Sequence, residues 1–204
     1  GSPSRVYRID RQSGDPTGYV VLGDSEGNGV SPHAGGLAAH GDYLFVAGDE
    51  DACLYIYKLS DVLSSESGTI IKMVDEFHTT YRSDKINVAF LCFTDDRLIV
   101  GEFYRVPNYM TEESHWITTR SGDENHALAF CYGFSDGEDS VCGIDTKPSE
   151  IWSLPGLVQG MAEYDGKIWI SQSYGTAKST ISSYDISGSE PVDFKMHIYS
   201  GRAE

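Results

Sequence analysis

The side chains of this sequence best suited to chemistry are polar residues that stand at the ends of short apolar segments. One group precedes such segments and another follows them; together they are His33, Asn87, Gln159, Asp49, Glu102 and Gln172. An imidazole, two carboxylates and several amides can hold a hard cation such as calcium, and they can also bind a polyhydroxylated molecule such as a sugar. The sequence therefore predicts a site for a divalent cation or a glycan where these segments end.

A long polar loop at residues 104–125 supplies further candidates. Its members of interest are Arg105, Tyr109, His115 and Trp116. Tyr174, just beyond the third apolar segment, adds an aromatic ring on which a sugar can stack. We expect Arg105, His115 and Tyr174 to take part in ligand binding, with the loop covering the site as a lid.

The set most suited to hold a metal ion is His33, Asp49 and Glu102. If the ion activated a water molecule, His33 or Glu102 would serve as general base. Glu102 ends an apolar segment, and a partly buried carboxylate requires a partner, for which Arg105 is a candidate. Structural roles stay open too: hydrogen bonds between strands for His33 and the glutamines, and anchoring of the loop for His115.

A repeated pattern positions these residues. Residues 36–47, 87–101 and 160–171 align with one another, the second being longer at its turn. Each reads as a short apolar strand, a turn rich in Gly or Asp, and an alternating strand, because these residues tolerate the backbone angles of tight hairpins. Two further strands follow each hairpin, at residues 53–58 and 70–77, 126–132 and 150–154, and 180–185 and 194–199.

Four antiparallel strands per unit is the pattern of a propeller blade. The predicted fold class is therefore all-β and β-propeller-like, with three full four-stranded blades and a partial one, residues 5–10 and 18–22, before them. Residues 61–64 read as a short helix. Residues 1–204 form a single domain, which we expect to be truncated at the C-terminus because a propeller needs at least four blades to close. An open β-sandwich or meander is the alternative.

Composition limits the partners. The formal net charge is −16, from 31 acidic and 15 basic residues, so we expect no nucleic-acid partner. No apolar stretch approaches the length of a membrane span, so we expect no membrane insertion. The four cysteines include no CxxC pair, which argues against a zinc or redox motif. Cys131 and Cys142, which stand on either side of a loop, are the favoured disulfide pair.

Several motifs taken together resemble a known group of proteins. They lie at residues 33–47, 100–104, 111–115, 129–133, 158–162 and 171–175. They resemble secreted propeller-like proteins of the kind common in actinobacteria, and the resemblance covers most of the chain from Arg5 onward. It implies a propeller fold and a location outside the cytoplasm. That group has no assigned activity, so the resemblance implies no reaction.

Three functions stay open from the sequence. The favoured one is an extracytoplasmic propeller-like protein that binds a small polar ligand or glycan at the face where the candidate residues converge. Nucleophile and zinc motifs such as GxSxG and HExxH are missing, which favours binding over catalysis. The alternative is a metal-dependent hydrolase or lyase that uses the same face. The third is a scaffold or adhesion module whose strand edges are the working surface.

Overall fold

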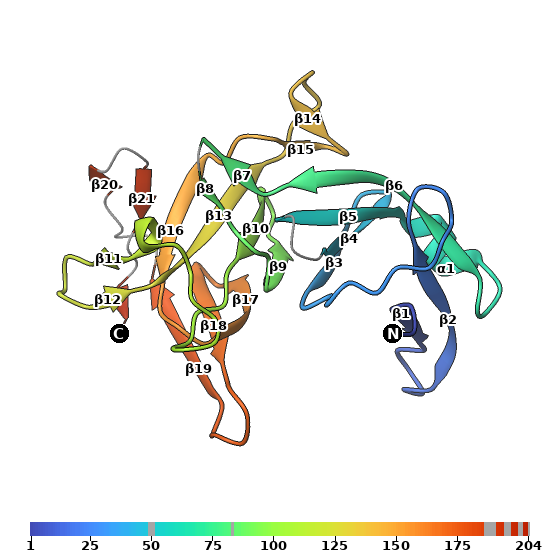
Figure 1. Ribbon diagram of the computed structural model, residues 1–204, viewed down its shortest axis with the longest axis horizontal. Helices are drawn as coiled ribbons and strands as arrows, with labels where there is room; N and C mark the ends of the chain where they lie inside the picture. Colours follow the sequence, from blue (N-terminus) through green and yellow to red (C-terminus); the bar gives the residue numbers. More distant parts are fainter. Residues whose placement is uncertain (49–51, 83, 186–190, 194–196, 200–201, 204) are drawn as a thin grey trace.

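Nearly all regular elements of this protein are β-strands, as the computed structural model shows (Figure 1). The structure describes residues 1–48, 52–82, 84–185, 191–193, 197–199 and 202–203. Most strands belong to three curled sheets, and the remaining strands form short, separate two-stranded ribbons. The fold is therefore all-β, as the sequence predicts.

The first sheet holds the first predicted unit. In spatial order its strands are β1 (Arg5–Ile9), β2 (Pro16–Gly23), β6 (Ile70–His78), β5 (Cys53–Lys58), β4 (Tyr43–Ala47) and β3 (Leu37–His40). Strands β3 to β6 are antiparallel to their neighbours, whereas β2 runs parallel to β6. The prediction that the N-terminal strands belong to a separate, earlier unit is therefore wrong, because they extend the first sheet at β6.

The second sheet holds the second unit. Its strands are β20 (Pro191–Asp193), β21 (His197–Tyr199), β16 (Glu150–Leu154), β13 (Ala127–Gly133), β10 (Arg97–Gly101) and β9 (Phe90–Phe93). The third sheet consists of β17 (Val158–Tyr164), β18 (Lys167–Gln172), β19 (Thr180–Asp185) and β22 (Arg202–Ala203). Residues 194–199 were predicted as the fourth strand of this unit. The described part of that segment, β21, instead pairs in parallel with β16, and β22 takes the place beside β19.

Short elements connect the sheets. The helix α1 (Leu59–Ser64) follows β5 directly and buries Val62, which confirms the predicted helix. The ribbons are β7 (Thr80–Tyr81) with β8 (Asp84–Lys85), β11 (Ile117–Thr118) with β12 (Glu124–Asn125), and β14 (Ser140–Val141) with β15 (Ile144–Asp145). A single 3-10 turn, η1 (Glu113–His115), lies in the long loop between β10 and β13.

The core lies on both faces of the second sheet, and β13 shows why. Its apolar run is buried at six successive positions, Ala127 to Tyr132. Leu128, Phe130 and Tyr132 pack in the cluster shared with the first sheet. The intervening residues, Cys131 among them, pack in the cluster shared with the third sheet. A strand covered on both faces reads as a continuous apolar run because neither set of alternating side chains meets water.

All four cysteines carry free thiols. The predicted disulfide between Cys131 and Cys142 is therefore wrong. Cys131 points into the core between the second and third sheets, whereas Cys142 packs against the cluster on the other face of the second sheet. In the part of the chain that the structure describes, no helix is long and apolar enough to span a membrane.

Candidate functional site

Three of the predicted site residues stand at one end of the hairpin strands. The backbone N–H of Ala89 donates to the carbonyl of Gly101, with the two atoms 2.9 Å apart, so Asn87 and Glu102 flank neighbouring strand ends. The segment that carries His33 packs against Ala89. The side chains of His33 and Asn87 are exposed and that of Glu102 is buried. The backbone therefore brings the segments that carry these three residues together at one end of the hairpins.

Glu102 forms a buried pair with His115. Its Oε2 lies 2.9 Å from Nδ1 of His115, and it also accepts a hydrogen bond from the backbone N–H of Leu128 at 3.1 Å. The two side chains have exposed fractions of 5% and 0%. Arg105 is therefore not the partner of Glu102: a histidine from η1 takes that place.

The pair is an electrostatic unit closed off from solvent. Burial raises the pKa of Glu102, and the hydrogen bond from His115 offsets only part of this rise. Burial would lower the pKa of His115, but the hydrogen bond and the charge of Glu102 outweigh it, so the pKa of His115 is raised. Its Nε2 has no hydrogen-bond partner among the described residues, and Oδ1 of Asp84 lies 4.0 Å away.

This burial determines what the pair can do. Oε2 of Glu102 contacts both Nδ1 of His115 and the backbone N–H of Leu128 in β13, so the pair holds the loop between β10 and β13 against the second sheet. A substrate has no direct access to a side chain with no exposed surface. Of the predicted metal set, Asp49 lies outside the described residues. Within the described ranges, no group of three or more His, Cys, Asp or Glu side chains is placed to hold a metal ion.

The other predicted residues meet at a second, more accessible place. The guanidinium carbon of Arg105 lies 3.7 Å from the ring centre of Tyr174. The ring of Phe103 stacks on the same tyrosine at 6.3 Å and meets Tyr109 edge-on at 5.3 Å. Tyr109 is 50% exposed. We call Phe103, Arg105, Tyr109 and Tyr174 the Arg105 cluster.

Two sets of backbone hydrogen bonds position this cluster. After β10 the backbone folds back on itself, because Arg105 and Tyr109 exchange two backbone hydrogen bonds of 2.8 Å. The start of β17 is tied to this loop by the N–H of Leu157, which donates to the carbonyl of Tyr104 at 3.0 Å. The cluster therefore sits where the second sheet meets the third.

The two predicted glutamines serve this junction. Nε2 of Gln172 donates to the carbonyl of Gly156 at 2.7 Å, and Nε2 of Gln159 donates to that of Ser173 at 3.2 Å. Both amides thus satisfy backbone carbonyls at this junction, which is the structural role left open for them. Their carbonyl oxygens face no donor in any described hydrogen bond.

Phe103, Tyr104 and His126 are aromatic residues of this region that were not among the predicted site residues. Phe103 was passed over, although its position between Glu102 and Tyr104 at a strand end was a usable signal. Tyr104, Trp116 and His126 form a second stack, in which Tyr104 lies 4.6 Å from the ring of His126 and nearly parallel to it. Tyr104 is buried in the cluster shared by the second and third sheets, so this stack anchors the loop there.

Comparison with known proteins adds no relative. The chain matches no family model, no curated protein and no solved structure. The resemblance of its motifs to secreted propeller-like proteins stays a prediction. Function must therefore come from the geometry of the site, because a fold by itself does not specify a function.

Proposed function

We propose that this protein is an extracytoplasmic, propeller-like binding protein that holds a small polar ligand or a glycan on the Arg105 cluster. The observation that carries the proposal is the guanidinium of Arg105 lying over the ring of Tyr174. The rings of Phe103 and Tyr109 contact the same tyrosine. The location outside the cytoplasm rests on the motif resemblance alone.

The chemistry of the cluster suits a sugar. Binding sites for polar organic ligands combine apolar and aromatic surface with a few placed polar groups. The rings of Tyr109 and Tyr174 offer flat surface for the C–H face of a pyranose. Arg105 supplies a planar fork of N–H donors for ring or hydroxyl oxygens. No carboxylate pairs with Arg105 in the part of the chain that the structure describes, so these donors remain available to a ligand.

The pairing of the strands supports the propeller arrangement. Strands β3 to β6 follow one another as antiparallel neighbours, and so do β9, β10, β13 and β16. The first strands of the three units lie side by side, since β9 contacts both β3 and β17. Blades arranged around a common axis place their first strands in this way. In a propeller arranged in this way, we expect the Arg105 cluster to stand at the rim of the central channel.

Binding can be tested with soluble neutral hexose, N-acetylhexosamine and uronic-acid oligosaccharides. Saturation-transfer NMR reports which of them touch the protein, and titration calorimetry gives the affinity of the best one. Tyr174→Ala should weaken its binding about tenfold, which corresponds to about 1.4 kcal/mol, because it removes the stacking surface and the support of Arg105. Arg105→Gln should weaken binding similarly by removing the donor fork.

Tyr164→Ala is the matched control. Tyr164 is 74% exposed and stands at the far end of β17 from the cluster, so its loss should leave binding unchanged. Circular dichroism checks that each variant is folded. Equal weakening by Tyr164→Ala, or no contact with any of the oligosaccharides at millimolar concentration, would contradict the proposal.

A further inference from the structure

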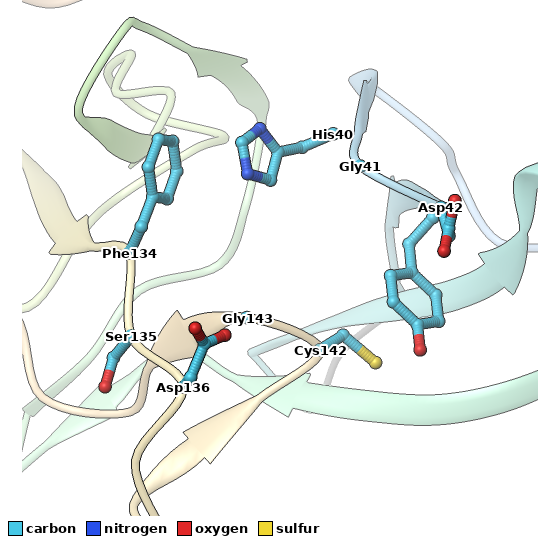
Figure 2. A pocket seen from close by; sticks show the side chains of 9 residues that line it. His40, Gly41, Asp42, Phe134, Ser135, Asp136, Cys142 and Gly143 are labelled. Carbon is cyan, nitrogen blue, oxygen red and sulfur yellow. The ribbon is translucent and has the colours of Figure 1, made fainter.

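A second candidate site lies at the opposite strand ends from the Arg105 cluster. It is a cleft of about 510 Å³ lined by His40, Gly41, Asp42, Tyr43, Phe134, Ser135, Asp136, Cys142 and Gly143. Figure 2 shows the turn between β3 and β4 on one side, facing the segment after β13 and the turn between β14 and β15. We call it the His40 cleft.

Aromatic packing fixes one wall of the cleft. The ring of His40 lies 4.1 Å from that of Phe134 and 4.8 Å from that of Phe93, within about 22° of parallel to each, and the two phenylalanine rings are 6.2 Å apart. Phe134 therefore presents a ring at the cleft that has little freedom to move. Tyr43 lines the other side, and the ammonium group of Lys58 already lies 5.8 Å from its ring centre.

Two carboxylates are available at the cleft. Asp42 belongs to the hairpin turn and Asp136 to the opposite wall, and both are exposed (Figure 2). Neither carboxylate forms an ion pair or hydrogen bond with any residue that the structure describes. Elsewhere in the protein, comparable exposed acids do have partners: Asp139 pairs with Lys147 and Asp96 with Arg97, each at 2.8–2.9 Å.

The shape of the cleft decides between a metal ion and an organic ligand. Its volume falls in the range of small-molecule sites, roughly 300–1,000 Å³, and is far larger than a bare ion needs. Its His, Asp and Cys side chains are also not grouped in a way that could hold a metal ion, as is true of all the described residues. Aromatic rings attract an ammonium or guanidinium group within about 6 Å of the ring centre, and unpaired carboxylates add to that attraction. The net charge of −16 enriches cations near the surface.

We propose that the His40 cleft binds a small organic cation that carries ammonium or guanidinium groups, through Asp42, Asp136 and the ring of Phe134. This proposal is independent of the glycan site, because it uses the other ends of the strands and none of the same residues. It also does not depend on whether the Arg105 cluster binds a sugar.

The probe is putrescine, compared with its neutral analogue 1,4-butanediol, by titration calorimetry at 150 mM salt. Putrescine should bind and butanediol should not. Asp42→Asn/Asp136→Asn should weaken putrescine binding at least about tenfold, and Phe134→Leu should weaken it severalfold, because they remove the charges and the ring respectively. Glu26→Gln/Glu66→Gln removes two exposed acids elsewhere and should change binding less than about twofold.

Alkylation of Cys142 gives an independent readout. Its thiol lines the cleft and is partly exposed, whereas Cys53 and Cys131 are buried. Putrescine should slow the alkylation of Cys142 by iodoacetamide, measured peptide by peptide, and leave that of the partly exposed Cys92 unchanged. Absence of putrescine binding, equal weakening in the Glu26/Glu66 variant, or equal binding of the diol would overturn the proposal.

Discussion

At the residue scale, the side chain that matters most to the long loop is His115. It stands in a 3-10 turn and contributes to no regular sheet, yet its ring is buried completely against Glu102. A buried charge is tolerated when a partner of opposite charge accompanies it, and removal of one partner is then costly. The pair thus couples the loop that carries Arg105 and Tyr109 to the second sheet.

This coupling predicts how stability depends on pH. The folded-state pKa of His115 is raised above its ordinary value of 6.5. The stabilisation of the folded state by protonated His115 is therefore fully present below about pH 6.5, and it is lost as the pH rises through the folded-state pKa of His115. The raised pKa of Glu102 acts in the same direction. The unfolding free energy, measured with urea, should fall as the pH rises above 6.5, by about 1.4 kcal/mol for each pH unit by which the pKa of His115 is raised.

Variants of the pair check the cause. His115→Gln should cost about 3 kcal/mol near pH 6 because it leaves Glu102 buried without a cation, and it should flatten the pH dependence above 6.5. His78→Gln changes an exposed histidine at the end of β6 and should alter neither quantity. A pH profile that stays the same in His115→Gln would assign the dependence to other groups.

At the element scale, the pairing of β9 with β10 depends on a missing side chain. Phe90 and Gly101 are directly opposed across these strands. A Cβ at Gly101 would lie 2.1 Å from a ring atom of Phe90, far inside contact distance. Glycine in a strand marks such a close approach. The close packing of Phe90 on Gly101, the last residue of β10, therefore fixes the position of the strand end that carries Glu102.

Gly101→Ala should destabilise the protein by about 1–3 kcal/mol, the usual cost of overpacking a core. Adding Phe90→Leu should recover part of the loss, because the smaller side chain makes room for the new methyl group. Gly133→Ala, in β13, is the matched control: nothing lies within 4 Å of its Cβ position. Urea unfolding measures all three, and an equal loss in Gly133→Ala would point to the backbone rather than to Phe90.

At the scale of the whole molecule, charge is the dominant property. A net charge of −16 on 204 residues produces repulsion between like charges that opposes folding. Salt screens this repulsion, with a screening length of about 10 Å at 0.1 M. The same field attracts cations, which fits the ligand proposed for the His40 cleft.

Raising sodium chloride from 10 to 150 mM should therefore raise the melting temperature. A gain of about 1 kcal/mol corresponds to roughly 2–4 °C for a chain of this size. Most of the gain should come below 150 mM, where screening changes most. A rise that continues evenly to 1 M would instead indicate exclusion of salt from the protein surface. Calorimetry in a salt series distinguishes the two.

Much of the strand map follows from local sequence. The hairpins around His40 and Asp165, the strands β5, β16 and β19, and the helix after β5 lie where alternation and turn residues predict them. Alternation and turn chemistry act over a few residues, so they can be read without knowing the rest of the chain. The expectation that polar residues gather at one end of the hairpin strands has the same origin.

Only the tertiary structure decided which distant groups meet. The sequence could not show that His115, 13 residues along the chain, reaches Glu102 in place of Arg105, or that Arg105 turns to Tyr174. It likewise could not show that β2 joins β6, or that Cys131 and Cys142 face different surroundings. Such partners are selected by packing between segments far apart in sequence, whereas the alternation that marks a strand is a property of each segment alone.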